Sequence, residues 1–450
     1  MVYFNKPGTV DNFLDMITEG EVHGRLRSNN FYYAFKNPDI GHKDNVIGGV
    51  GASIVYESAT YSNIDFLLGY YVSTAFFDHD KTNTRYFKSG KDLFSRHDYS
   101  NNGDRYMAVL GQASVKYSGI AKSDIILGRQ FVETFYTKSN DTKMIPNTFD
   151  GGVFKTKLLS DTKLQFAYLA KQKLRDHTEN HSVLMVDDRS SSDFSKWDGN
   201  DDSAMHRGLT HSALKANNKK TDAPLLIVDA KNKSVKNLKI DSSFYNVPEL
   251  LSQAMLELNY KLKFDGFSIS PGIRYIRQFD NGAGKVGGAS YLNNTKDYSD
   301  PTSLEAEMIA ARVVTKIGDY KINLGFSNIR DKADLVTPWR GFPTAGYTRS
   351  MGVYNWRANT KSYRLELVRN PNDNAVYRDV FVQASVLYTD ADDDKFAGDD
   401  YMYYYIGFIQ NIPALPELQW RLRVGYNQFL DQPAQDYSYL DSRFELNYMF

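Results

Sequence analysis

The sequence predicts an all-β protein, a transmembrane antiparallel up-and-down β-barrel of about 18 strands. Segments with a two-residue hydrophobic period follow one another along the chain, and the connections between them alternate short and long. The chain also stops on such a segment, RFELNYMF at 443–450, in which Phe444, Leu446, Tyr448 and Phe450 alternate with mostly polar residues. Because chain ends usually fray in water, we expect this last strand to pair with the first one and close the barrel.

Composition excludes several classes of protein. A closed sheet can run to 450 residues as one unit, and 32 Tyr and 27 Phe against 13 Pro fit many strands and few helices. The absence of cysteine excludes disulfide scaffolds and thiol chemistry, and 54 basic against 54 acidic residues argue against a nucleic-acid partner. No stretch approaches the roughly 18 apolar residues of a membrane helix. The opening MVYFNKPGTV lacks signal-peptide features, which favours a processed mature chain.

The strands are expected in pairs, each with one apolar and one polar face. In order they are 20–36, 45–60, 62–77, 103–118, 121–132, 151–159, 161–173, 222–231, 234–246, 250–264, 266–280, 303–317, 318–331, 361–370, 376–391, 399–411, 417–430 and 438–450. Residues 20–450 are therefore predicted to form a single barrel domain. Residues 1–19 are predicted to be an N-terminal periplasmic segment. Its short helix at 10–17 has an apolar stripe that we expect to pack inside the periplasmic mouth.

The connections predict which rim of the barrel faces which side. Tight turns such as 263–266 and 317–319 use glycine and aspartate for the backbone conformations of a hairpin. The long loops, among them 78–102 and 174–221, fall on the opposite rim. Short turns at the periplasmic rim and long loops at the extracellular rim are typical of outer-membrane barrels.

The alternative is a soluble β-sandwich, whose strands would show the same alternation. Three features favour a membrane crossing. The strands are ten to sixteen residues long, aromatic residues such as Tyr70, Tyr71, Phe76 and Phe77 recur at their ends, and the long loops are charged. The chain therefore lacks a second apolar layer that could cover the first, and a closed cylinder leaves no strand edge exposed.

Two loops, 131–149 and 332–360, are expected to fold into the lumen and narrow it. The first has charged and polar residues of mixed sign around a Met-Ile-Pro core that could pack on the inner wall; the alternative is that it stays in solvent. The second has too many aromatic residues for a solvated loop. The candidate constriction residues are Asn140, Asp141, Lys143, Asp150 and Arg340.

Arginines recur on the polar faces of the strands. Rows of guanidinium groups along a narrow pore can pass an anionic group from one to the next. The alternative, equally open from the sequence, is a set of inward salt bridges with Glu366, Glu445 and Asp441. Arg129 reaches the lumen only if a β-bulge interrupts its strand. The candidates are Arg25, Arg129, Arg274, Arg364, Arg421, Arg423 and Arg443.

Residues outside the strands suggest a metal site, an enzyme or a surface-binding protein as other possibilities. The run DADDDKFAGDD at 390–400 fails the calcium-loop pattern, because Lys395 replaces the glycine and Tyr401 the closing glutamate; a loose loop-borne divalent site remains an alternative. The eight histidines stand beside no serine-hydrolase motif, so we expect neither an enzyme nor a cofactor. A surface-binding protein or adhesin that presents its long loops is the main rival to a channel.

Several stretches resemble the Opr family, the OprD-like outer-membrane porins. They are GEVHGRLR, GRQFVETF, NDTKMIPNTFDGG, YNVPEL, GIRYIRQFDNGAGKVGGASYLN and TPWRGFPTAGYTRSMGVYNWRANTKSY, and the resemblance as a whole runs from about residue 20 to 450. The resemblance implies an 18-stranded barrel in the outer membrane of a Gram-negative bacterium, narrowed by inward loops, with an arginine ladder on one wall. It also implies small solutes that often bear carboxylates. The long charged segments 78–102 and 174–221 depart from the pattern.

The function expected from these observations is passive diffusion of small polar solutes and ions. Selectivity would come from a mixed-charge loop constriction and an inward arginine ladder. The expected partners are small polar or anionic solutes, outer-membrane lipid and the barrel assembly machinery, which the aromatic last residue would address. Length and strand count fit a monomer as well as a trimer.

Overall fold

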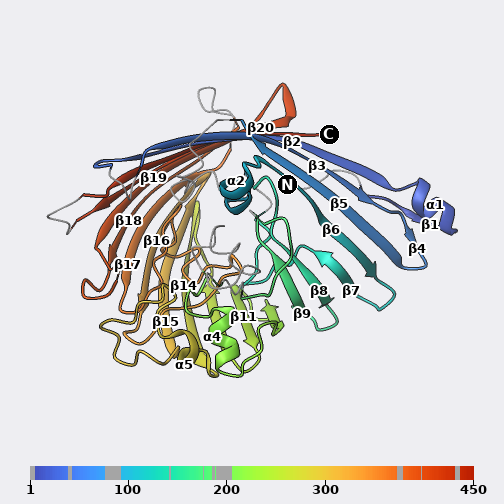
Figure 1. Ribbon diagram of the computed structural model, residues 1–450. Coiled ribbons are helices and arrows are strands. Elements are labelled where there is room, and N and C mark those ends of the chain that lie inside the picture. Colours follow the sequence, from blue (N-terminus) through green and yellow to red (C-terminus); the bar gives the residue numbers. More distant parts are fainter. Residues whose placement is uncertain are drawn as a thin grey trace.

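The strands of this chain pair in sequence order and close into an antiparallel barrel, as Figure 1 shows. The described residues form twenty-one strands, of which β1 (Thr9–Val10), β4 (Thr60–Tyr61) and β13 (Leu262–Lys263) are two-residue additions at the rim; the other eighteen make the wall. The computed structural model describes residues 6–38, 43–76, 93–140, 143–175, 177–184, 188, 205–371, 379–396, 398–430 and 436–450.

Every predicted strand is present, with ends within four residues of those expected. The period-two pattern locates the strands well because each of them has one face in the lumen and one outside. The wall strands are β2 (Glu21–Phe35), β3 (Asn45–Glu57), β5 (Ile64–Ala75), β6 (Tyr106–Tyr117), β7 (Ser123–Gln130), β8 (Thr148–Thr156), β9 (Thr162–Lys173), β10 (Leu225–Asn232), β11 (Leu238–Val247), β12 (Leu251–Tyr260), β14 (Phe267–Asp280), β15 (Ala306–Ile317), β16 (Tyr320–Ile329), β17 (Lys361–Arg369), β18 (Val380–Asp390), β19 (Tyr401–Ile412), β20 (Leu415–Phe429) and β21 (Tyr439–Met449).

The last strand closes the barrel as predicted. β21 pairs with β20 on one side and with β2 on the other. The N–H of Gly24 donates to the carbonyl of Phe450 at 2.7 Å, and the N–H of Phe450 donates back to Gly24 at 3.1 Å. The final residue is therefore held by two backbone hydrogen bonds, which explains why a strand pattern runs to its end.

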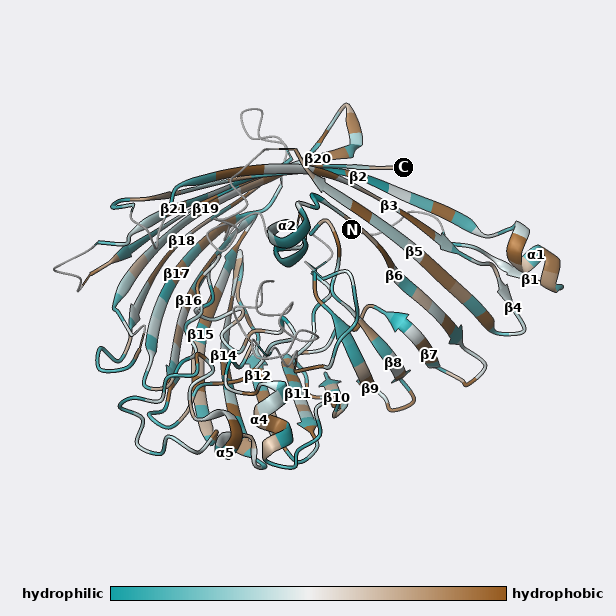
Figure 2. Ribbon diagram, in the orientation of Figure 1, coloured by the Kyte–Doolittle hydropathy of each residue, from teal (hydrophilic) through white to brown (hydrophobic). Residues whose placement is uncertain are grey.

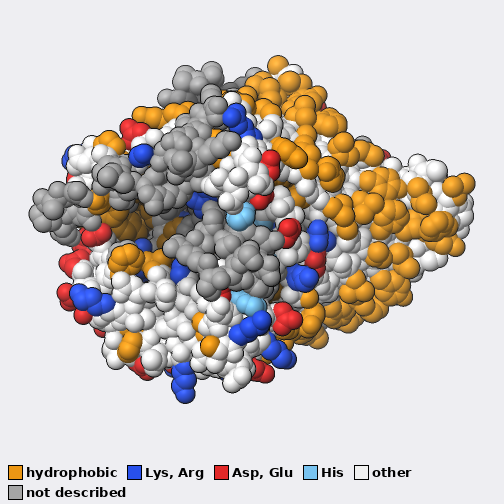
Figure 3. Space-filling view, viewed as in Figure 1, with side chains coloured by type: hydrophobic (Ala, Val, Ile, Leu, Met, Phe, Trp, Pro, Cys, Tyr) orange, Lys and Arg blue, Asp and Glu red, His pale blue; other side chains and the backbone are white. Residues whose placement is uncertain are grey.

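The outer face of the barrel is apolar and the inner face polar. Figure 2 shows hydrophobic and hydrophilic residues alternating along the strands, and Figure 3 shows a belt of hydrophobic side chains on the outside. On β16, for example, Tyr320 and Leu324 are exposed to the outside, whereas Asn323 and Ser327 are buried inside. No layer of the described structure covers this belt, so it suits lipid.

Two expected loops pack on the inner face of the wall and on each other. Thr137 forms an isolated bridge with Arg340, and the N–H of Gly341 donates to the carbonyl of Tyr136 at 2.8 Å. The ring of Tyr245, which points inward from β11, contacts Tyr136 at 4.6 Å and Trp339 at 4.8 Å between centroids. Loops 131–149 and 332–360 therefore share one buried aromatic cluster.

The helices are short. They are α1 (Phe13–Thr18), α2 (Arg96–Asn102), α4 (His211–Ala216) and α5 (Ala283–Gly287), and no described helix is long and apolar enough to cross a membrane. The position predicted for the N-terminal helix is wrong. The stripe residues Phe13, Leu14 and Ile17 are exposed, and Met16 is the buried anchor. The helix contacts the rim through this one side chain and its backbone, so its apolar stripe does not enter the mouth of the barrel.

Candidate functional site

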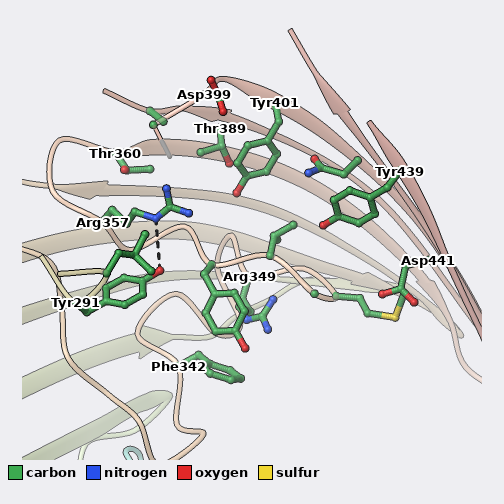
Figure 4. A pocket seen from close by; sticks show the side chains of 18 of the residues that line it. Tyr291, Phe342, Arg349, Arg357, Thr360, Thr389, Asp399, Tyr401, Tyr439 and Asp441 are labelled. Carbon is green, nitrogen blue, oxygen red and sulfur yellow. Dashed lines mark hydrogen bonds between the residues drawn. The ribbon is translucent and has the colours of Figure 1, made fainter. Parts of the chain in front are cut away.

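A cavity of about 490 Å³ lies inside the barrel between the inner wall and the loops. Its wall comes from β18 to β21 and β2, and its other side from the loops around residues 291, 340–358 and 391–399 (Figure 4). Among the described lining residues, eight are basic and three acidic: Lys143, Arg175, Arg340, Arg349, Arg357, Lys395, Arg423 and Arg443 against Asp392, Asp399 and Asp441. The cavity therefore has an excess of positive charge.

Aromatic rings form much of the wall of this cavity. Tyr33 of β2 stacks on Tyr439 of β21, with centroids 4.7 Å apart and planes at 24°. Tyr401 of β19 lies beside them, facing the loop residues Phe342 and Arg349 across the cavity in Figure 4. Flat rings next to guanidinium groups can contact the body of a planar solute while the charges hold its polar end.

Arg349 is the most distinctive group of the site. Its guanidinium lies over the rings of Phe342, Tyr354 and Trp356, at 4.5, 5.3 and 5.7 Å from their centroids. Its Nε and Nη1 atoms have no acceptor, and no carboxylate of the described residues pairs with it. Burial lowers the pKa of the guanidinium from its ordinary value, because desolvation disfavours the charged form. The Arg349 side chain is only half-buried, so an anion in the cavity beside it would meet a charge that no described carboxylate shares.

The segment 340–349 separates this cavity from two others of about 380 Å³ each. Arg349 lines the first and second cavities, and Arg340 and Phe342 line the first and third. The second cavity reaches Val368 and Phe381, next to the short-turn rim, whereas the first opens among the long loops. Arg349 therefore lies where the two sides of the lumen meet.

Two wall arginines hold this partition in place. Arg274 of β14 donates to the carbonyls of Pro343 and Ala345 at 2.7 and 2.8 Å, and Arg312 of β15 donates to that of Gly346 at 2.9 Å. The ring of Tyr347 lies between the two guanidinium groups, 4.5 and 4.6 Å from them. Both arginines pair with Glu257. Arg274, which the sequence predicted to belong to the ladder, thus donates hydrogen bonds to the loop 332–360.

Four more of the ladder arginines form the ion pairs that the sequence left as an alternative. Arg364 pairs with Glu366, and Arg443 donates from Nε to Asp441 at 2.9 Å. Arg421 and Arg423 share Glu445, the former at 3.7 Å. Two cations on one carboxylate leave a net positive charge at this place on β20 and β21.

The other candidates are spread around the lumen. Asn140 and Lys143 line the first cavity, and Arg25 is buried on the inner face of β2. Arg129 pairs with Asp150 at 2.8 Å instead of lining this cavity. The bulge expected in the strand of Arg129 is not found: β7 pairs with β6 and β8 without a register shift, and the shift after Asp150 belongs to the pairing of β8 with β9. Asp141 lies outside the described residues.

The sequence patterns did not single out five arginines of the lumen. Arg27, Arg175, Arg312, Arg349 and Arg357 were not among the candidates, although four of them line a cavity. For Arg349 and Arg357 the signal was local: RSMGVYNWR places two arginines around closely spaced Tyr354 and Trp356. For Arg175 and Arg312 nothing in the local pattern indicated a role.

A buried carboxylate fixes the loop that carries Arg357. Asp334 accepts from the N–H groups of Tyr291 and Ala358, at 3.1 and 2.9 Å, and from the hydroxyl of Tyr298 at 2.7 Å. Burial raises its pKa, although these donors oppose the shift. Arg357 donates to the hydroxyl of Tyr291 at 3.4 Å, drawn as the dashed line in Figure 4.

The acidic run at 390–400 is partly neutralised from within. The Nζ of Lys395 lies 2.9 Å from Asp331 and also contacts Asp392, and it sits over the ring of Tyr298 at 5.2 Å. No group of three or more metal-type ligands occurs among the described residues. The lysine occupies the place between carboxylates that a divalent cation would need.

Mild acid is expected to loosen the loop that holds His206. This buried ring donates from Nε2 to the carbonyl of Gly288 at 3.0 Å and accepts at Nδ1 from the N–H of Gly208 at 3.2 Å. Burial lowers its pKa from 6.5 to about 4. The opened loop takes up a proton below about pH 6.5 and the closed loop does not, so up to about 3 kcal/mol of local stability is lost as the pH falls to about 4. Hydrogen exchange around 205–217 checks this.

The control is His206→Gln, whose amide can donate and accept without titrating. Exchange in this variant is expected to vary little between about pH 7 and about pH 4.5 beyond the intrinsic chemical rate. Equal protection of the unaltered chain at both values would contradict the role given to His206.

Solved structures with a similar fold are known for this architecture. No family model matches the sequence, and no curated protein matches it. The structure is similar to Acinetobacter baumannii OccAB1, with a TM-score of 0.73 at 13% identity, covering 97% of each chain. It is similar to Pseudomonas aeruginosa OccK8 (OprE), with a TM-score of 0.72 at 13% identity, covering 97% of this chain and 99% of that one. The fold is that of the OprD-like channels.

A third similar structure is Pseudomonas aeruginosa OpdK with vanillate, with a TM-score of 0.70 at 11% identity, covering 96% of this chain and 98% of that one. The OprD-like fold extends over nearly the whole chain in each comparison. The resemblance noted from short sequence stretches is thus confirmed for the fold. At 11 to 13% identity the likeness concerns the fold, and the side chains of the lumen are particular to this chain.

Proposed function

We propose that this chain is an outer-membrane porin of a Gram-negative bacterium that admits small polar solutes by passive diffusion and favours anionic ones. The observation that carries the proposal is Arg349: a guanidinium without a carboxylate partner, held by three aromatic rings where two lumen cavities meet. The excess of basic residues around the first cavity and the OprD-like fold add support.

A carboxylate-bearing solute would pass from the long-loop side to the short-turn side over successive cations. It would enter the first cavity near Arg357 and Arg443, reach Arg349, and continue into the second cavity beside Arg364 and Lys321. Several partly neutralised sites suit transport better than one strong site, because binding must be weak enough for release. The surrounding apolar wall strengthens the field of these charges.

The loops 131–149 and 332–360 would form the constriction. Their shared aromatic cluster and the hydrogen bonds from Arg274 and Arg312 fix the partition across the lumen. The apolar belt would face outer-membrane lipid, and insertion would depend on the barrel assembly machinery. A monomer and a trimer both fit this surface.

Removing Arg421 and Arg423 tests the ladder. In a variant with both changed to glutamine and Glu445→Gln added, permeation of a small carboxylate into proteoliposomes is expected to fall about three- to tenfold relative to a neutral solute of similar size. The third substitution is needed because Glu445 is buried and would otherwise be left without its partners. Liposome swelling measures both rates, and Glu445→Gln alone is the matched control.

Equal loss for the anionic and the neutral solute would contradict the ladder. A folded barrel that passes neither solute would instead favour the rival function, a surface-binding protein that uses its long loops.

A further inference from the structure

The N-terminal segment is hydrogen-bonded to the short-turn rim of the barrel. β1 pairs in parallel with β4, and the N–H of Thr60 donates to the carbonyl of Gly8 at 2.9 Å. The N–H of Ala59 donates to the carbonyl of Met16 at 3.0 Å, and the Met16 side chain is buried. These contacts fix α1 beside the turn between β3 and β5, at the corner labelled α1 in Figure 1.

Tyr56 shows that α1 lies on the outer side of this rim. Tyr56 pairs across the sheet with Val22 and Leu68, and both are exposed on the outer face of the barrel. Residues opposite one another in a sheet share a face, so the side chain of Tyr56 points outward. Its hydroxyl donates to the carbonyl of Ile17 at 2.6 Å. The end of α1 is therefore held from the outer face of the barrel.

The side of α1 that is turned away from these contacts is apolar and uncovered. Phe13, Leu14 and Ile17 are 63%, 68% and 43% exposed. Figure 3 shows hydrophobic side chains continuing from the strands out to this corner of the molecule. The apolar surface of α1 thus extends the lipid-facing belt beyond the ends of the strands.

We propose that α1 is an interfacial anchor, whose Phe13, Leu14 and Ile17 insert into the headgroup region of the periplasmic leaflet. The lipid that these side chains contact is zwitterionic phospholipid. The residues 11–19 contain Asp11, Asp15 and Glu19 and no basic residue, so burial of apolar surface and not attraction to anionic headgroups drives the contact. The proposal rests on the membrane location in the proposed function but not on which solute passes.

The absence of cysteine allows a direct test with single labels on the whole chain. An environment-sensitive nitrobenzoxadiazole label at Leu14→Cys is compared with one at Glu19→Cys, which lies on the other side of the helix axis and is also exposed. Leu68→Cys, on the lipid-facing belt, is the reference. Each protein is placed in phosphatidylcholine vesicles, with and without a lipid that has a nitroxide near the top of its acyl chain.

The label at position 14 is expected to emit at shorter wavelength than the one at 19 and to be quenched by the nitroxide lipid at least about threefold more strongly, in low and high salt alike. Equal weak quenching at both positions, with both accessible to aqueous iodide, would overturn the proposal. So would protection of position 14 from both quenchers, which would mean that a protein surface covers it. A lack of quenching at position 68 would refute the membrane location itself, and the anchor with it.

Discussion

Changing Arg349 to glutamine is expected to abolish most of the anion preference of the channel while leaving the barrel folded. The guanidinium lines both the first and the second cavity and has no carboxylate partner among the described residues, so its charge acts on whatever passes. Loss of one poorly screened charge at such a point is worth about 1–2 kcal/mol, or about five- to thirtyfold in the relative permeation of an anion. The reversal potential in a salt gradient measures it.

Two further variants separate charge from structure in this experiment. Arg349→Lys keeps the charge but lacks the planar group that stacks on Phe342 and Trp356, so we expect partial retention of selectivity. Arg277→Gln is the matched control, because Arg277 pairs with Glu305 and Glu307 and does not line the first cavity. If Arg349→Gln and Arg277→Gln changed selectivity equally, the special role of Arg349 would be wrong.

Changing Trp339 to alanine is expected to release the partition and enlarge the pore. The Trp339 side chain is fully buried, its Nε1 donates to the carbonyl of Val183 at 2.7 Å, and its ring contacts Tyr245. Such a truncation costs about 3–5 kcal/mol in a packed core. The eighteen-stranded wall has its own hydrogen bonds, so we expect the loss to fall on the loops. Single-channel conductance should rise, and the anion preference should weaken.

Trp339→Phe controls for the hydrogen bond to Val183. It keeps a buried aromatic ring but loses the indole N–H and the second ring, a far smaller loss than in the alanine variant, so its conductance should stay near that of the unaltered channel. An unchanged conductance in the alanine variant, with loops that remain protected from hydrogen exchange, would show that Trp339 does not hold the partition.

The wall of the barrel could be predicted from the sequence because its signal is local. Each strand alternates between lumen and outside, so the period-two pattern locates β16 or β20 without knowledge of the partner strands. The burial of loop aromatics was predictable for a similar reason: rings such as those of Trp339 and Tyr347 are too apolar for a solvated loop, and both are buried.

The site depended on contacts that no local pattern contains. The bridge of Thr137 to Arg340 joins two distant loops, and Arg274 reaches Pro343 from another strand. The position of an arginine on the polar face of a strand indicates that its side chain points inward. It does not indicate whether a carboxylate forms an ion pair with it. Arg421 and Arg423 of β20 share Glu445 of β21, whereas Arg349, which lies in a loop, has no carboxylate partner among the described residues; both facts depend on the folded chain.

Single-channel recording shows whether the barrel is an open pore with an anion preference. The purified chain, refolded in detergent and checked for heat-modifiable migration, is added to a planar bilayer with a salt gradient across it. We expect stepwise ohmic openings and a reversal potential whose sign shows that anions pass more readily than cations. A folded barrel without conductance, or one with a cation-selective reversal potential, would contradict an anion-preferring pore.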